Sequence, residues 1–294
     1  MLKEIEILLN KILNVPKIVD YTRLKGLTNE SYLVTDIKND KYVIRFPGKG
    51  TEKIINRKNE KISTELAFKI GIDPTKLYYF DDNNGIKITE YIDKSQTMSA
   101  ELLRENDNIM LVAEVLKKLH SCGVDTGISF DVISMAERYE KFVTENNGTM
   151  YDDYEDVKLY INTIKNKYLS SVELKPCHND PICENWLLKD NIMYLIDWEY
   201  AGMNDCIWDL ADVSIEAEYS HENDIELLSA YFGHDVTDKE WMAFQINKVL
   251  IDYLWSLWGK TRAVYEGQEM ENYALIRYSR MRNNIEILKK QFVL

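Results

Sequence analysis

The stretch from Pro176 to Leu210 constrains the fold most, because it has the pattern of a short hairpin with polar side chains at both ends. Two apolar runs, Trp186–Leu188 and Ile192–Ile196, flank the polar turn Lys189–Asn191. Apolar runs joined by an Asp-Asn turn are typical of two antiparallel strands. The sequence therefore predicts a β-hairpin whose two ends lie side by side.

Polar side chains occur where this hairpin begins and ends. Asn185 comes directly before the first predicted strand, and Asp197 comes directly after the second. Asp180, five residues before Asn185, can lie within a few ångströms of both. Carboxylate and amide oxygens are hard ligands that suit Mg²⁺, and one carboxylate is left to accept a proton. This is the minimal equipment for moving a phosphoryl group from ATP to a hydroxyl.

Two motifs connect the stretch with a known group of enzymes. His178-Asn179-Asp180 with Asn185, followed by Asp197 after an apolar run, resembles the catalytic loop and metal-binding Asp of protein-kinase-like enzymes. A lone Asp-x-x-x-x-Asn is common, whereas the joint pattern with a hairpin between its parts is far more specific. The strings CHND and LIDWEY, with a later Trp-x-x-Trp, are similar to the bacterial branch of the choline/ethanolamine kinase family, in the superfamily of the aminoglycoside phosphotransferases.

The residues before this stretch predict a small lobe built on a sheet. Residues 1–14 form an amphipathic helix that Pro16 ends, and a second helix runs from about Glu52 to Ile70, where Gly71 caps it. The five predicted strands are Lys17–Leu24, Ser31–Asp36, Lys41–Phe46, Leu77–Phe80 and Ile86–Tyr91.

From Ser99 onward the pattern is helical apart from the hairpin. The predicted helices include Ile109–His120, Asp131–Glu145 and Asp153–Leu169. His120 is expected to be a helix-terminal or packing residue. The expected fold is α+β and two-lobed, as in protein-kinase-like enzymes. Its N-lobe, residues 1–91, holds a small antiparallel sheet, its C-lobe, residues 92–294, is mostly helical, and the two share one active cleft.

The resemblance implies that the N-lobe binds the nucleotide. Arg45 stands where protein kinases carry a phosphate-binding Lys, and choline kinases resemble this chain in carrying Arg. By the family's Arg-x-x-Glu signature, Glu60 pairs with Arg45 and Arg57 contacts the nucleotide or a neighbouring loop, the alternative being a solvated helix face. The other nucleotide-side residues lie at the tip of the first loop, which by itself has the pattern of an ordinary hairpin, and at the hinge: Gly26, Thr28, Asn29 and Tyr91.

The same resemblance assigns the catalytic loop. Asp180 is the expected base that orients and deprotonates the substrate hydroxyl, and His178 orients the loop by hydrogen bonding. Asn185 and Asp197 are the expected Mg²⁺ ligands. Pro181 departs from the protein-kinase pattern and favours an extended backbone at Asp180.

Aromatic residues in the C-terminal third point to the acceptor. Trp255 and Trp258 are three residues apart, on one helix face, where core packing is an equally open interpretation. Quaternary ammonium groups bind to aromatic faces, and choline kinases are similar in lining their pocket with a Trp-x-x-Trp helix and a later Tyr. The further candidates are Tyr273 or Tyr278, Tyr200 and Glu199, with Glu216 as an additional acid. Glu199 is equally consistent with a place near the metal, and Glu216 with plain helix surface.

Composition limits the partners. The chain of 294 residues has a net charge of −13, which argues against nucleic acid and weakly favours a cationic small molecule. No apolar run approaches the roughly 20 residues of a membrane span. Four cysteines lack CxxC spacing and suggest free thiols in a reducing cytoplasm, and a zinc site at Cys177, His178 and Cys183 is rejected because no fourth ligand is apparent.

The expected function is phosphorylation of choline by Mg·ATP, giving phosphocholine and ADP. Ethanolamine, an aminoglycoside or another amino alcohol is the alternative acceptor, and a non-catalytic kinase-like binding protein is the alternative from a different class. Asp180, Asn185 and Asp197 are all present, which argues against a dead enzyme. The oligomeric state stays open.

Overall fold

The computed structural model describes residues 2–24, 26 and 29–291. The chain divides into two compact units. The first comprises Met1–Met98 and Glu184–Ala201, and the second comprises Ser99–Cys183 and Gly202–Leu294. The lobes predicted over residues 1–91 and 92–294 stay a prediction; the compact units differ from them in that the hairpin segment belongs with the N-terminal residues.

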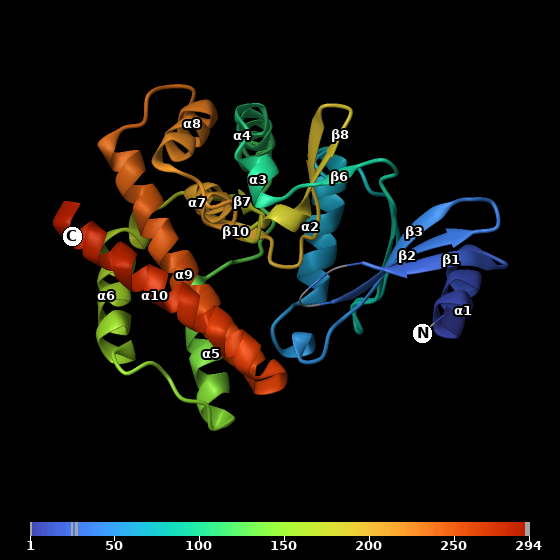
Figure 1. Cartoon of the computed structure of the whole chain (residues 1–294), viewed down its shortest axis with the longest axis horizontal. Coiled ribbons are helices and arrows are strands. Elements are labelled where there is room, and N and C mark those ends of the chain that lie inside the picture. Colours follow the sequence, from blue (N-terminus) through green and yellow to red (C-terminus); the bar gives the residue numbers. More distant parts are fainter. Residues whose placement is uncertain (1, 25, 27–28, 292–294) are drawn as a thin grey trace. The chain divides into compact units, whose positions relative to one another are not determined.

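The first unit is built on a five-stranded antiparallel sheet in the order β1-β2-β3-β5-β4 (Figure 1). Alternate side chains of β2, Tyr32 and Val34 among them, are buried, as expected of a sheet with one face in the core. The helix α1 packs Ile5 and Leu9 into the same core. The bounds are α1 Leu2–Leu13, β1 Ile18–Arg23, β2 Glu30–Asp36, β3 Lys41–Phe46, β4 Leu77–Phe80 and β5 Lys87–Glu90. These strands agree with the predicted ones to within one residue at each end.

The predicted helix over residues 52–70 is wrong at its start. Thr51–Lys53 forms a separate 3-10 turn, η1, and the helix α2 covers Arg57–Lys69. Asn56 caps α2, because its side chain accepts hydrogen bonds from the backbone N–H groups of Lys58 and Asn59. The cap therefore begins a new helix at the point where the sequence pattern suggested a continuous one.

The predicted hairpin is confirmed. Its strands are β8, Trp186–Lys189, and β9, Ile192–Leu195, and β6, Gln96–Thr97, pairs with β8. The two turn residues, Asp190 and Asn191, have positive φ angles of 51° and 59°. Two successive left-handed residues form the tight turn that matches the twist of antiparallel strands, and Asp and Asn tolerate that conformation.

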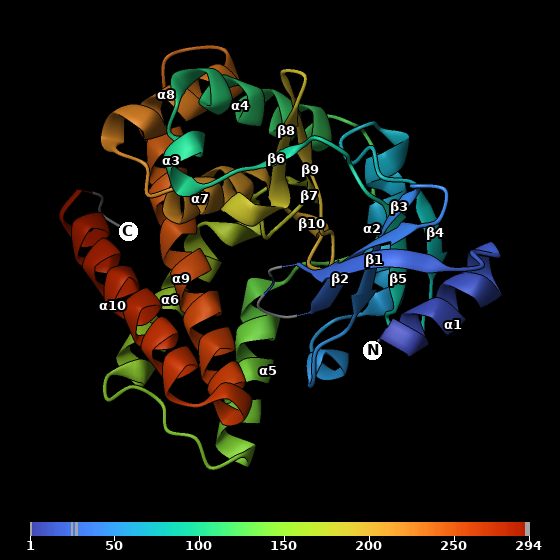
Figure 2. The same ribbon diagram turned by 45° about the vertical axis from the view of Figure 1, so that its right-hand side comes forward.

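The second unit is mainly helical (Figures 1 and 2). Its longest helices, α9 (Asp238–Glu266) and α10 (Gln268–Gln291), run side by side after a turn at Gly267. They approach closely at Gly259, where an added Cβ would lie 2.8 Å from Tyr273 Cδ1. The other elements are α3 Ala100–Leu103, α4 Asn106–His120, α5 Val132–Glu145, α6 Tyr154–Lys167, η2 Leu169–Ser171, β7 Leu174–Cys177, β10 Gly202–Asp205, α7 Cys206–Glu216 and α8 His221–Phe232, and η3, Cys183–Asn185, crosses the boundary between the units.

A helix that spans a bilayer must be both long and apolar. Within the described residues, none of the helices is long and apolar enough to cross a membrane.

Candidate active site

A buried carboxylate, Glu60 of α2, organises the charged cluster of the first unit. Its Oε1 lies 2.6 Å from Nη1 of Arg45, at the end of β3. Arg57 Nη1 and Lys87 Nζ lie 2.8 and 3.1 Å from its carboxylate oxygens. Burial raises the pKa of Glu60, but Lys87, Arg45 and Arg57 outweigh burial and hold it well below its usual range. The predicted Arg45–Glu60 pair is thus present, and Lys87 is a cation of this cluster that the motif did not reveal.

Asp197 follows β9 and faces the same cations. Its Oδ1 lies 3.3 Å from Arg45 Nη1 and 3.8 Å from Lys87 Nζ, while about a third of its side chain stays exposed. Its φ angle of 68° is unusual for a residue with a side chain. At the same open end of the hairpin, just before β8, the backbone O of Asn185 accepts a hydrogen bond from the N–H of Ile196. The hairpin thus brings the two predicted metal ligands to one end, as expected from its pattern.

Glu199 lies in this cluster as well. Its Oε2 is 3.2 Å from Arg57 Nη1, 3.5 Å from Arg45 Nη1, and accepts a 3.0 Å hydrogen bond from Asn29. Burial raises the pKa of Glu199, and the charge of Asp197 raises it further. These contacts place Glu199 beside Asp197, the predicted metal ligand, which is one of the two positions that the sequence left open.

The other residues predicted to lie on the nucleotide side make few contacts that bear on nucleotide binding. Gly26 is exposed, and Thr28 lies outside the described residues. The N–H of Tyr91 donates to the backbone O of Lys41, whose Nζ lies 5.7 Å from the Tyr91 ring centroid.

Asp209 of α7 holds the loop that carries the predicted base, in the second unit. Its two carboxylate oxygens accept the backbone N–H groups of His178 and Asn179, each at 2.7 Å. His120 Nε2 lies 3.0 Å from the same carboxylate, so the buried end of α4 supports the loop through Asp209. Asp209 was not predicted from the sequence, because its contacts join residues about 30 positions apart.

Asp180 itself is positioned by short-range contacts. Its N–H donates to His178 Nδ1 at 3.3 Å, which is the loop-orienting contact expected of His178. The N–H of Ile182 donates to the O of Asp180 at 2.9 Å, so the chain makes a tight three-residue turn with Pro181 at its centre. Pro181 is therefore compatible with a catalytic loop.

One buried group could be mistaken for a metal site. His120, Cys177 and Asp209 bring their ligand atoms within 4.8 Å of one another. Burial raises the pKa of the Cys177 thiol well above its usual range, and its Sγ contacts the backbone O of Asn204. With Asp209 already accepting three hydrogen bonds, the group is a structural network.

Three of the predicted acceptor residues form an aromatic cluster in the second unit. The rings of Trp255 and Trp258 are 6.1 Å apart, and those of Trp258 and Tyr273 are 5.7 Å apart, both nearly perpendicular. Arg277 lies over the Tyr273 ring at 5.1 Å. Tyr200 is buried but belongs to the first unit.

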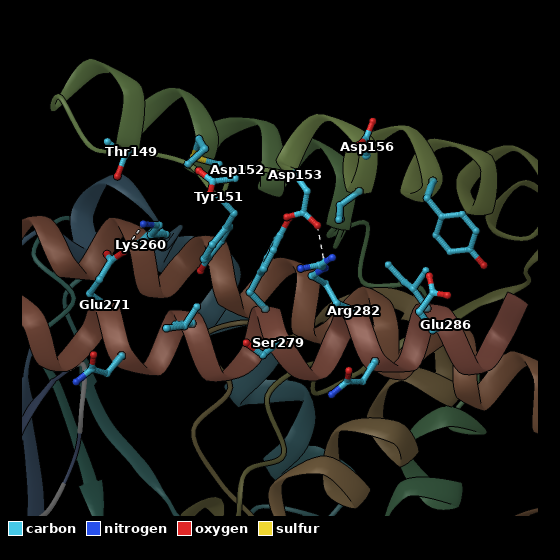
Figure 3. A pocket seen from close by; sticks show the side chains of 18 of the residues that line it. Thr149, Tyr151, Asp152, Asp153, Asp156, Lys260, Glu271, Ser279, Arg282 and Glu286 are labelled. Atoms are coloured by element: carbon cyan, nitrogen blue, oxygen red, sulfur yellow. Dashed lines mark hydrogen bonds and ion pairs between the residues drawn. The ribbon is translucent and has the colours of Figure 1, made fainter.

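Tyr278 lies in different surroundings. Its ring stacks on Tyr151 at 3.5 Å and its hydroxyl donates to Asp153. Both tyrosines line a cavity of about 940 Å³ between α6, α9 and α10, which Figure 3 shows with the ion pairs Lys260–Glu271 and Asp153–Arg282 at its edges. Tyr273 is thus the tyrosine that accompanies the tryptophans.

Charged groups act on the aromatic cluster. Burial raises the pKa of Tyr273, Arg277 opposes this effect, and the charges of Glu216, Asp180 and Asp212 raise the pKa further. Glu216 is paired with Arg277. The arrangement offers aromatic faces and negative charge in the unit that carries the predicted base.

The chain is similar to known proteins in both sequence and structure. A sequence model of the choline/ethanolamine kinase family matches residues 22–230. Protein LicA of Haemophilus influenzae is 30% identical over 262 residues, covering 85% of this chain and 96% of that protein. The choline kinase LicA from Streptococcus pneumoniae has a similar structure, with 30% identity, a TM-score of 0.84 and coverage of 97% of this chain and 99% of that one.

More distant structures share the fold. The GDP complex of aminoglycoside 2'-phosphotransferase-IIIa has a TM-score of 0.71 at 15% identity, over 96% of this chain and 99% of that one. The α+β kinase-like fold expected from the sequence is therefore confirmed. Since the family model spans well over half of the chain, this protein is a member of the choline/ethanolamine kinase family.

Proposed function

We propose that this chain transfers the γ-phosphoryl group of Mg·ATP to the hydroxyl of choline, giving phosphocholine and ADP. The observation that carries the proposal is the aromatic cluster of Trp255, Trp258 and Tyr273. The carboxylate of Glu216 is near this cluster, because its partner Arg277 lies over the Tyr273 ring. A quaternary ammonium has no N–H to donate, so aromatic faces and nearby negative charge are its natural partners. The similarity to a protein described as a choline kinase supports the same acceptor.

A primary ammonium would need different partners. Ethanolamine carries three N–H donors and should be held by acceptor atoms more than by rings. The edge-on packing of Trp258 against both Trp255 and Tyr273 favours the methylated cation. The similarity to aminoglycoside phosphotransferases concerns the fold and does not extend to their substrates.

In the proposed reaction Asp180 accepts the proton of the choline hydroxyl. The hydroxyl oxygen forms a bond with the γ-phosphorus, the bond from that phosphorus to the β,γ-bridging oxygen breaks, and ADP leaves. Asp209 contributes by holding the backbone of the loop that carries Asp180. Since positioning and charge neutralisation carry most of the catalysis in phosphoryl transfer, a rigid loop matters more than covalent chemistry.

Arg45 and Lys87 are proposed to face the phosphates, with Glu60 holding both cations in place. Asn185 and Asp197 would hold Mg²⁺. The donor set fits this metal, because Asp197 keeps part of its carboxylate exposed at the strand end and both ligands offer hard oxygens. When bound, the ion would neutralise charge on the phosphate oxygens.

The test is ADP release from Mg·ATP with choline, ethanolamine, several aminoglycosides or no acceptor. We expect turnover with choline well above the others. The variant Asp180→Ala should lower kcat by about 10²- to 10⁴-fold, the usual contribution of a general base, while Mg·ATP still binds in calorimetry. Preference for ethanolamine or an aminoglycoside would overturn the acceptor, and near-normal turnover of Asp180→Ala would remove Asp180 from the base role.

A further inference from the structure

Asp212 is a buried acid whose neighbours on its own helix all have partners. It lies on α7 three residues after Asp209 and four before Glu216, so the three carboxylates share one helix face. Asp209 accepts hydrogen bonds from the catalytic loop, and Glu216 pairs with Arg277. Asp212 is 0% exposed, and within the described part of the chain neither of its carboxylate oxygens has a hydrogen-bond partner.

Such a group is costly in a folded protein. Buried carboxylates are nearly always hydrogen-bonded or paired with a cation, because removal from water without compensation is expensive. Burial raises the pKa of Asp212 well above its usual range, and the charges of Glu216, Asp180 and Asp209 raise it further against the opposing effect of Arg277. The group is therefore stable either with a proton or with a cation that arrives from outside.

Neighbouring residues on α7 and α10 connect Asp212 with the aromatic cluster. Asp212 lies one helical turn before Glu216, whose partner Arg277 lies 5.1 Å from the centroid of the Tyr273 ring. That ring packs against Trp258. Aromatic rings offer contact area to a neutral group as well as to a cation of the same shape. A buried carboxylate discriminates between the two by charge, and it does so strongly where water is excluded.

We propose that Asp212 is a specificity-determining residue of the acceptor site, whose buried carboxylate selects a cationic acceptor over a neutral alcohol of the same shape. The assignment rests on the choline kinase activity proposed above. In the free protein burial disfavours the ionised form of this carboxyl, and binding of the cationic acceptor favours that form. The neighbouring Glu216 contributes less, because Arg277 already neutralises it.

The experiment compares choline with 3,3-dimethylbutan-1-ol, in which carbon replaces the charged nitrogen. The neutral alcohol is measured both as an acceptor and as a competitor of choline, so that a constant is obtained even where turnover is slow. Asp212→Asn should raise the KM for choline about tenfold, equivalent to about 1.4 kcal/mol, and leave the constant for the neutral alcohol and the KM for ATP unchanged. The matched control is Glu114→Gln, an equal charge change at an exposed position of α4.

A second readout needs no variant. The KM of the wild type for choline should fall as pH rises through the pKa of Asp212, whereas the constant for the neutral alcohol should not follow that titration. Asp180, Asp209, Glu216, Tyr273 and Arg277 face Asp212 or its neighbours and are common to both acceptors, so the difference between the two profiles isolates the charge effect.

Three outcomes separate the possibilities. An equal loss for both acceptors in Asp212→Asn, or no loss for either, overturns the role of Asp212 while leaving choline phosphorylation in place. Parallel pH profiles for the two acceptors in the wild type overturn it too, even if the variant fails to fold. A folded wild type without choline turnover contradicts the proposed function itself.

Discussion

Glu60 shows how a single residue can fix several others. It is fully buried and contacts Arg45, Arg57 and Lys87, which come from three different elements of the first unit. The motif predicted the first of these pairs, because the spacing of Arg45 and the helix is a property of the sequence. Lys87 could not be predicted from the motif, because its contact with Glu60 depends on the pairing of β5 with β3, in which Lys87 lies opposite Arg45.

Neutralising Glu60 should therefore affect both stability and nucleotide binding. Glu60→Gln leaves three cations without their shared anion, and we expect the free energy of unfolding to fall by about 3 kcal/mol and the KM for ATP to rise. Urea unfolding and steady-state kinetics measure the two effects. Glu65→Gln, on the exposed face of the same helix, is the control. Equal small effects of both substitutions would show that the cluster contributes little.

Asp209 and Asp212 are two residues that sequence motifs could not identify. Both belong to α7, whose sequence pattern gave no reason to single out these two acids. The importance of Asp209 comes from backbone contacts with His178 and Asn179, and that of Asp212 from the lack of a hydrogen-bond partner within the described residues. Neither property can be seen before the chain is folded.

Among the elements, the hairpin of β8 and β9 was the most predictable, since its turn depends on local chemistry at Asp190 and Asn191. The start of α2 was not, because a cap at Asn56 competes with a helical pattern that continues on both sides. The different surroundings of Tyr273 and Tyr278 could not be predicted either. They are five residues apart on α10 and contact different neighbours, Trp258 for Tyr273 and Tyr151 for Tyr278.

The close approach of α9 and α10 gives a test of the aromatic cluster. In Gly259→Ala the new Cβ would lie 2.8 Å from Tyr273 Cδ1 and 3.0 Å from Ala274 Cβ, so the helices must separate. We expect a loss of about 1 to 2 kcal/mol in stability and a rise in the KM for choline, with the KM for ATP unchanged. Thermal unfolding and kinetics provide the measurements. Val264→Ala, at an exposed position of α9, is the control, and an unchanged KM for choline would separate this contact from the acceptor site.

For the whole molecule, buried acids link stability to pH. The pKa of Asp212 is raised in the folded protein, so its contribution to stability is complete below the usual carboxyl pKa of about 4 and is lost as pH rises through the folded value. The wild type should therefore lose stability relative to Asp212→Asn as pH rises over that range. Urea unfolding of both proteins in a pH series measures this, and a difference independent of pH would show that Asp212 has the same pKa when folded and unfolded.

The first unit combines two separate segments of the chain, and this affects how it folds during synthesis. This unit consists of two separate pieces of chain, and the second piece, Glu184–Ala201, supplies Trp198, which bonds to Asp73, and Asp197, which faces Lys87. A ribosome delivers the first piece long before the second, with residues 99–183 synthesised in between. Until the later piece emerges, the first piece exposes the surfaces that the later piece covers. The first unit is therefore expected to fold to completion only after about two thirds of the protein has been translated.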